Sequence, residues 1–156
     1  MDKYMDQLMA PAFMKNPPVK LDIPAKTLGL IYAILGAIGV LFGLFGLLAA
    51  LGLSAVATAV GVGGVWILLL VGGLVSEVGT ALAAWGGYKM YQGDHAAKRT
   101  VVMGLVISII GGLISALGTF GGGLPGWIIS ALITFVLYYL VIISRFSDEK
   151  VSGSTA

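Results

Sequence analysis

The segment GVWILLLVGGLVSEVGTALAAWGGYKMY, residues 64–91, decides the fold of this chain. It can cross a bilayer as one helix, because a crossing takes about 20 predominantly apolar residues. One acidic residue, Glu77, stands near its middle. A charge at the centre of a bilayer costs from about 3 to well over ~10 kcal/mol, depending on how the cost is measured. The rest of the chain is therefore expected to pack around this helix in a way that tolerates the carboxyl group.

Small residues lie on both sides of Glu77 in this segment. Residues of this size let the backbone of a second membrane helix approach closely. They are Gly72, Gly73, Ser76, Gly79, Thr80, Ala83 and Ala84. The segment is therefore predicted to pack against neighbouring helices through its small residues.

The composition is that of an integral membrane protein. Of 156 residues, 58% are hydrophobic and only 10% are charged, and the mean hydropathy is +1.02. A soluble domain carries about a quarter charged residues. Two runs, residues 27–76 and 100–144, contain no Asp, Glu, Lys or Arg. Each run is long enough for two crossings. The predicted fold class is an all-α integral membrane protein built as a four-transmembrane-helix bundle.

The predicted crossings form one domain, residues 25–146, between two tails. Segment 53–63 is expected to be a loop at the surface opposite the termini. Residues 1–24 form a tail with either a short amphipathic helix in the membrane interface or no fixed structure. Residues 147–156 are expected to be a disordered tail. The four crossings are predicted at about 25–51, 64–91, 99–120 and 125–146.

The basic residues predict the orientation. All nine Lys and Arg fall in three segments: the N-terminal tail with the start of the first crossing, the connection near residues 89–99, and the region from Arg145 onward. With four crossings these segments share one side of the membrane, which the positive-inside rule makes cytoplasmic. Both termini are therefore expected on the cytoplasmic side of the cell membrane, the inner membrane in a bacterium.

The two halves of the domain resemble each other. GLIYAILGAI at residues 29–38 aligns with GLVISIIGGL at 104–113, and Trp66-Ile67 is echoed by Trp127-Ile128. This pattern suggests two helical-hairpin repeats in the same orientation. On this alignment Glu77 corresponds to Tyr138, so one half alone carries the carboxyl group.

Glycines are the predicted packing residues. In the first crossing, Gly29, Gly36 and Gly43 recur every seven residues, with Gly39 and Gly46 between them. Such a stripe serves either contact with another helix of the same chain or self-association. The full predicted packing set is Gly29, Gly36, Gly39, Gly43, Gly46, Gly72, Gly73, Gly104 and Gly111.

Glu77 is the candidate functional residue. One interpretation is a neutral carboxyl group that shares hydrogen bonds with hydroxyl groups of neighbouring helices, because hydrocarbon disfavours the charged form. The others are proton or cation handling, and pairing with a basic group on another subunit. The predicted intramembrane polar site consists of Glu77, Thr80, Ser108, Ser115, Ser130, Thr134 and Tyr138.

The sequence shows no pattern for catalysis. It has no cysteine, and its one histidine, His95, lies in a predicted turn. The glycines at 121–123 lack the lysine of a phosphate-binding loop. No catalytic residues, metal or cofactor are therefore predicted, and nucleic acid is not an expected partner.

The expected function is non-enzymatic. The protein is predicted to act as a small accessory subunit, assembly factor or scaffold in the lipid bilayer, packing against other membrane proteins or against itself. The alternative is an oligomeric small transporter or channel that uses Glu77 to handle protons or cations.

Overall fold

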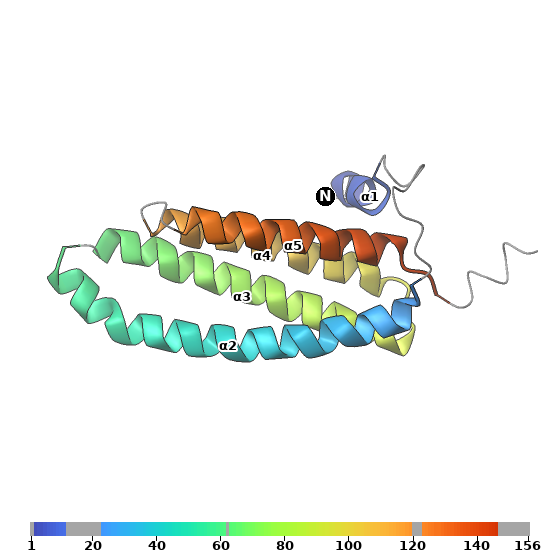
Figure 1. Ribbon diagram of the computed structural model, residues 1–156, viewed down its shortest axis with the longest axis horizontal. Helices are drawn as coiled ribbons and strands as arrows, with labels where there is room; N and C mark the ends of the chain where they lie inside the picture. Colours follow the sequence, from blue (N-terminus) through green and yellow to red (C-terminus); the bar gives the residue numbers. More distant parts are fainter. Residues whose placement is uncertain (1, 12–22, 62, 120–122, 147–156) are drawn as a thin grey trace, which may run out of the picture.

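The computed structural model describes residues 2–11, 23–61, 63–119 and 123–146. This part of the chain is helical and contains no β-strand. Four helices are long and apolar enough to cross a membrane, and they run side by side (Figure 1). The prediction of an all-α multi-pass membrane protein with four crossings is confirmed. The helices are α1 (Asp2–Met9), α2 (Ala25–Ala59), α3 (Gly63–Gln92), α4 (Ala97–Leu117) and α5 (Leu124–Ile143).

The connection between α2 and α3 is shorter than the sequence suggested. Residues 53–59 were expected in a loop but continue α2, and the turn follows at Val60 and Gly61. The reason is composition: residues 53–59 contain three alanines and no glycine or proline, so nothing in them breaks a helix. Gly61 then ends the helical path with a left-handed φ of 79°.

The predicted turn between α3 and α4 is present. Gly93 has a φ of 96°, in the left-handed region that favours glycine after a helix end. The Asp94 carboxylate accepts a hydrogen bond from the backbone N–H of Ala96 at 2.9 Å. The chain reverses here within a few residues, so α3 and α4 are tightly connected neighbours.

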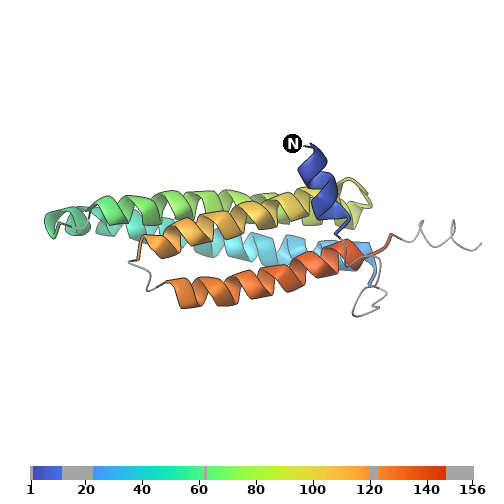
Figure 2. The ribbon, with the colours of Figure 1, turned by 90° about the horizontal axis from the view of Figure 1, so that it is seen from above.

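Helix α1 crosses the end of the bundle. It is seen end-on where the four long helices lie in the plane of view (Figure 1), and it lies over the start of α4 in Figure 2. Leu8 and Met9 pack against the buried core, and the Tyr138 hydroxyl donates to the Leu8 carbonyl. Of the two alternatives for residues 1–24, a helix forms over Asp2–Met9, while residues 12–22 lie outside the described part of the chain. The predicted tail 147–156 lies outside it too.

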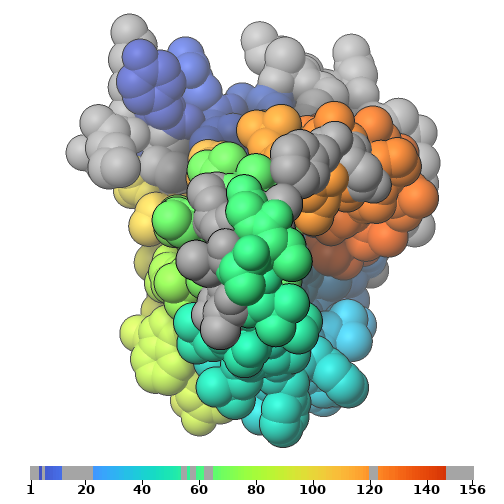
Figure 3. Space-filling model, turned by 90° about the vertical axis from the view of Figure 1, so that its left-hand side faces the viewer, coloured from blue at the N-terminus to red at the C-terminus, as the bar shows by residue number. Residues whose placement is uncertain are grey.

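The four long helices make an open arrangement. Helix α3 contacts both α2 and α4 extensively, α4 contacts α5 over a smaller area, and α2 barely contacts α5. Figure 3 looks along the bundle from the α2–α3 turn, with α2 (teal) at the bottom and α5 (orange) at the upper right. The packing order is therefore α2–α3–α4–α5, without a closing α2–α5 interface.

The first and last crossings meet at the end that carries the termini. The Ala25 N–H donates to the Arg145 carbonyl at 2.8 Å, and the Arg145 N–H donates to the Ile23 carbonyl at 3.1 Å. Lys98 in α4 donates to the Ser144 carbonyl. We call residues 23–25 and 144–146 the terminal clamp. Most of the buried core lies beside it, including Met90, Val101 and Phe146.

Candidate functional site

Two rows of glycine join α3 to α4. In α3 they are Gly72, Gly79 and Gly86, and facing them are Gly104 and Gly111 of α4 and Gly118, which caps its end, each seven residues apart. We call these six residues the glycine rows. The two helices run antiparallel, so the row in α3 meets the row in α4 at the same levels.

The backbones of α3 and α4 touch along the glycine rows. A Cβ atom added at Gly111 would lie 2.7 Å from the Gly72 carbonyl oxygen, and one added at Gly79 would lie 2.7 Å from the Gly104 carbonyl oxygen. No side chain larger than hydrogen fits at these distances. The predicted glycine set contains Gly72, Gly104 and Gly111. Gly79 was predicted to pack only as one of the small residues around Glu77, and Gly86 and Gly118 were not in the set. Their seven-residue spacing was the available signal.

Four of the predicted glycines in α2 face α3. A Cβ atom at Gly29 would lie 2.7 Å from the Gly87 carbonyl oxygen, and one at Gly36 would lie 2.6 Å from the Ala84 Cβ. Gly39 faces the Thr80 methyl group, and Gly43 faces the Glu77 carboxyl group. On α3, the predicted Gly73 faces Leu47 of α2.

Gly46 does not pack within the described chain. No heavy atom lies within 4 Å of a Cβ atom built there, so of the two predicted uses of the stripe, contact within the chain does not apply at Gly46, and self-association there stays a prediction. The position follows Gly43 by three residues, one turn along nearly the same face. Helix α3 still contacts α2 further along, at Leu47 and Ala50, so Gly46 is turned away from α3 and leaves a patch of exposed backbone.

The hydroxyl groups predicted to bind Glu77 have other partners. Ser108 Oγ lies 3.3 Å from Ser76 Oγ, and Ser115 Oγ donates to the Leu69 carbonyl at 3.0 Å. Thr80 and Thr134 each donate to the carbonyl four residues earlier in their own helix. Ser130 is exposed on α5, and Tyr138 binds Leu8. The predicted seven-residue polar site therefore does not converge on Glu77.

The Glu77 side chain turns toward α2. Its carboxyl group occupies the space over Gly43, where a Cβ atom would overlap it. Oxygen Oε1 is buried and has no hydrogen-bond partner among the described residues, although the side chain as a whole is only partly buried. The sequence analysis compared residues only by their depth in the membrane and did not predict this orientation. Consecutive side chains of a helix point in directions about 100° apart around its axis. Ser76 faces α4, and Glu77 consequently faces α2.

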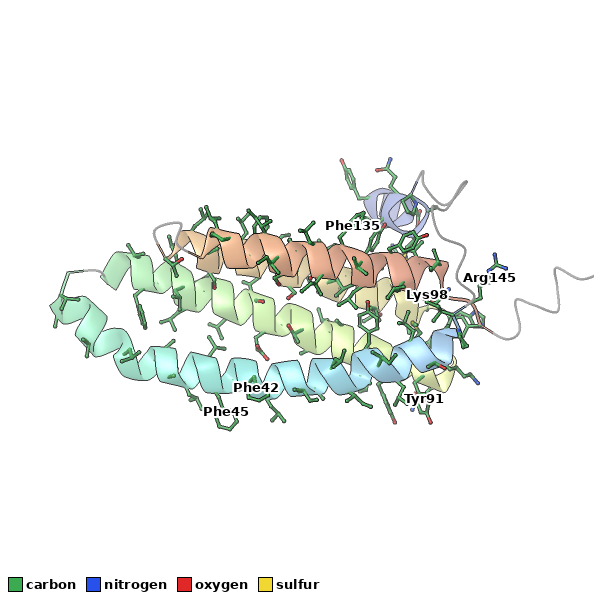
Figure 4. All side chains as sticks on the ribbon, viewed as in Figure 1. Phe42, Phe45, Tyr91, Lys98, Phe135 and Arg145 are labelled. Carbon is green, nitrogen blue, oxygen red and sulfur yellow. The ribbon has the colours of Figure 1, made fainter. Side chains whose placement is uncertain are left out.

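At the end of the bundle that carries the terminal clamp, polar side chains pack against an aromatic ring. The Lys98 ammonium lies 5.2 Å from the centre of the Phe146 ring, and the His95 ring packs on Phe146 with centroids 4.1 Å apart. Lys98 and Arg145 lie at this end in Figure 4, whereas Phe42 and Phe45 project from the outer side of α2. In the described part of the chain, no three His, Cys, Asp or Glu side chains gather as a metal site would require.

Comparison with protein-family models, with curated proteins and with solved structures finds no match for this chain. Within the described residues, the features that bear on function are the unpartnered carboxyl oxygen of Glu77 and the exposed helix faces beside it.

Proposed function

We propose that this protein is a non-enzymatic accessory subunit, assembly factor or scaffold that packs against another membrane protein. The observation that carries the proposal is the buried Glu77 Oε1 atom, which lacks a hydrogen-bond partner among the described residues. Membrane hydrocarbon offers no water to bind such a group, so leaving it unpaired costs free energy. The Glu77 side chain is only partly buried, so a rotation of its carboxyl group can bring this oxygen to the surface, where a donor from a second protein would remove that cost.

The surface next to Glu77 suits an incoming helix. Gly43 lies under the carboxyl group, and Gly46, one turn further along α2, exposes its backbone. Small residues let membrane helices approach closely enough to form hydrogen bonds between them. Phe42 and Phe45 project from the outer side of α2 and offer apolar contact area there (Figure 4). The partner we propose therefore brings a hydrogen-bond donor to the level of Glu77 on a helix that packs at Gly46.

The same residue supports a second candidate function, an oligomeric transporter or channel. Glu77 is the one acidic residue within the four candidate spans, and intramembrane carboxyl groups often serve proton or ion pathways. The open α2–α3–α4–α5 arrangement encloses no pathway alone, so this function requires several copies of the chain.

Purification from native membranes in mild detergent separates the two candidates. The subunit proposal predicts a different protein at fixed stoichiometry, and Glu77→Leu should release it. Glu77→Gln keeps the shape and hydrogen-bonding capacity and should retain it. Val78→Leu, a change at the exposed neighbouring position, is the matched control. A homo-oligomer whose cation flux in proteoliposomes is abolished by Glu77→Gln would instead establish the transporter and overturn the subunit proposal.

We also propose that the terminal end of the bundle faces the cytoplasm of the cell. Lys26, Lys89, Lys98, Arg99 and Arg145 belong to segments that end there, in agreement with the positive-inside rule. The chain has no native cysteine, so single cysteines report the topology directly. Val60→Cys should react with an impermeant thiol reagent in intact cells, and Ala96→Cys only after lysis. The reverse pattern would invert the orientation.

We also propose that the domain consists of two parallel helical-hairpin repeats. One contact in each half supports this. Trp66 Nε1 in α3 donates to the Ala50 carbonyl of α2 at 3.1 Å. Trp127 Nε1 in α5 donates to the Ile109 carbonyl of α4 at 3.0 Å. In each hairpin, a tryptophan near the start of the second helix binds the backbone of the first. Sequences of relatives with two equal halves would test the duplication.

A further inference from the structure

The outer side of α3 carries a cation and aromatic rings close to the end of the helix. On the inner side at this level, Gly86 packs against Val101 of α4, and Gly87 packs against Gly29 of α2. Consecutive residues of a helix lie about 100° apart around its axis, so the side chains of the remaining sector point away from both neighbouring helices. Four residues share this sector at helical spacing: Trp85, Tyr88, Lys89 and Gln92. We call these four residues the α3 outer face.

The side chains of the α3 outer face are accessible to a ligand. Trp85 is 56% exposed and Tyr88 is 45% exposed, and their ring centroids lie 6.1 Å apart. The Lys89 ammonium, on a side chain that is only partly buried, lies 5.7 Å from the centre of the Trp85 ring. A cation–π contact of this kind occupies none of the three N–H donors of an ammonium group. Those donors can therefore bind an anion while the lysine stays beside the ring.

The length of α3 places Lys89 at the level of the lipid head groups. The helix has 30 residues and is about 45 Å long, close to the thickness of about 40–45 Å of a bilayer with its head groups. Its last turn lies at the end of the bundle that carries the terminal clamp (Figure 1). Lys89 stands in that turn, about 5 Å along the axis before Gln92. Hydrocarbon fills only about 30 Å of the bilayer, so the group that surrounds Lys89 on the outer side is the phosphate layer.

The charge at this end of α3 is positive. A second ammonium, that of Lys26 in α2, lies 3.8 Å from a Cβ atom built at Gly93, the residue that follows α3. The acidic residue next in the chain is Asp94, and its carboxylate already accepts a hydrogen bond from the Ala96 N–H at 2.9 Å. A lipid head group with a net negative charge complements this surface, whereas a head group with its own ammonium competes with the lysines.

We propose that the α3 outer face binds the head group of an anionic phospholipid in the leaflet on the terminal side. The phosphate accepts a hydrogen bond from the Lys89 ammonium, and the glycerol and first acyl carbons lie against the Trp85 and Tyr88 rings. This site is separate from Glu77, which lies 12 residues before Lys89 and turns toward α2. The proposal therefore depends neither on the role of Glu77 nor on which end of the bundle faces the cytoplasm.

Native mass spectrometry of the full chain tests the site. The protein is equilibrated in detergent with equal amounts of phosphatidylglycerol and phosphatidylcholine that carry the same acyl chains. Wild type should retain one phosphatidylglycerol per chain and about fivefold less phosphatidylcholine, the contribution of one lysine near a membrane surface. Lys89→Met should retain the two lipids equally, and Lys89→Arg, which keeps the charge, should keep the preference.

Two matched controls separate this site from the general charge and apolar surface of the protein. Arg145→Met removes a cation from the terminal clamp and should leave the preference unchanged. Trp85→Leu should lower the retention of phosphatidylglycerol, while Phe135→Leu, at an exposed aromatic position of α5, should not.

Four results would overturn the proposal. They are equal retention of both lipids by wild type, an equal loss of preference in Arg145→Met and Lys89→Met, equal retention of phosphatidylglycerol by Trp85→Leu and wild type, and displacement of phosphatidylglycerol by inorganic phosphate, which would indicate a site for a soluble anion. Release of a bound protein by Lys89→Met without any change in lipid would assign the α3 outer face to a protein partner and would overturn the proposal too.

Discussion

Helices α4 and α5 have nearly the same length, and the most apolar stretch of each has the same mean hydropathy of 2.3, yet they pack in different ways. Buried residues occur along the whole of α4, from Ala97 to Ala116. In α5 the buried residues are Val141 and Ile142, both in its last turn. Hydropathy therefore predicts that both helices cross the membrane and does not predict which of them is enclosed by the protein.

Glycine spacing accounts for the difference between α4 and α5. Helix α4 carries Gly104 and Gly111 in the glycine rows, so the α3 backbone can approach it. The one glycine in α5, Gly126, has no atom within 4 Å of a Cβ position. Because lipid is as apolar as leucine, close van der Waals contact, rather than hydrophobicity, determines which membrane helices associate. We infer that α3 and α4 form the rigid part of the domain and that α5 is held to it at its two ends, by the terminal clamp and by the hydrogen bond from Trp127 to the Ile109 carbonyl.

Breaking the glycine rows should have the largest effect. Gly111→Leu places a side chain against the backbone of Ser76 and Gly72, so α3 and α4 can no longer touch. We expect a loss of about 3 kcal/mol or more in stability, the upper range for overpacking. Thermal unfolding in detergent, followed by circular dichroism, measures it. Gly126→Leu on α5 is the control and should unfold at the wild-type temperature; equal losses in both variants would remove the distinction between α4 and α5.

The α2–α3 interface should respond in the same way but less strongly. Gly36→Leu would collide with Ala84, where α2 can still move outward because α5 does not hold it along the span. We expect a loss of about 2 kcal/mol. Gly46→Leu, at the uncovered position of the same helix, should leave the purified chain unchanged. A large loss on Gly46→Leu would mean that the exposed patch is covered in the folded protein.

The sequence predicted the crossings well because apolar length is a property of each segment alone. The packing of α2 was also predictable, since Gly29, Gly36 and Gly43 lie seven apart. What the sequence did not predict is which face of α3 meets which neighbour. Glu77 and Ser76 lie at the same depth, but rotation about the helix axis sends one to α2 and the other to α4. That rotation depends on the two interfaces of α3 together, and no local pattern specifies it.

Releasing the terminal clamp should have a local effect on α5. Lys98→Met removes the charge-assisted hydrogen bond to the Ser144 carbonyl and the cation near the Phe146 ring. We expect a loss of about 1.5 kcal/mol, with faster hydrogen exchange at residues 140–146 and unchanged exchange in α3. Lys89→Met, which removes a cation beside Trp85 at the same end, is the control. Faster exchange throughout the bundle would show that the clamp supports all four helices.

The smallest effect is expected at Glu77. In the purified chain Glu77→Gln breaks no hydrogen bond among the described residues, so stability should change by less than about 0.5 kcal/mol. Ser76→Ala, one residue away, removes the contact with Ser108 and should cost about 0.6 kcal/mol, the average for such bonds in membranes. Urea or detergent unfolding curves measured together rank the two. A larger loss at Glu77 would reveal a partner for its carboxyl group within the chain.

The terminal clamp also has a consequence for biosynthesis. Helix α2 leaves the ribosome before the other crossings, but the residue whose backbone pairs with Ile23 and Ala25 is Arg145, which is made after all of them. Chains fold as they are synthesised, with earlier segments free to form contacts first. The glycine contacts of α2, α3 and α4 can therefore assemble while α5 is still being made. The ends of α2 and α5 are joined only when translation has passed the last crossing, so the terminal clamp is the last of these contacts to form.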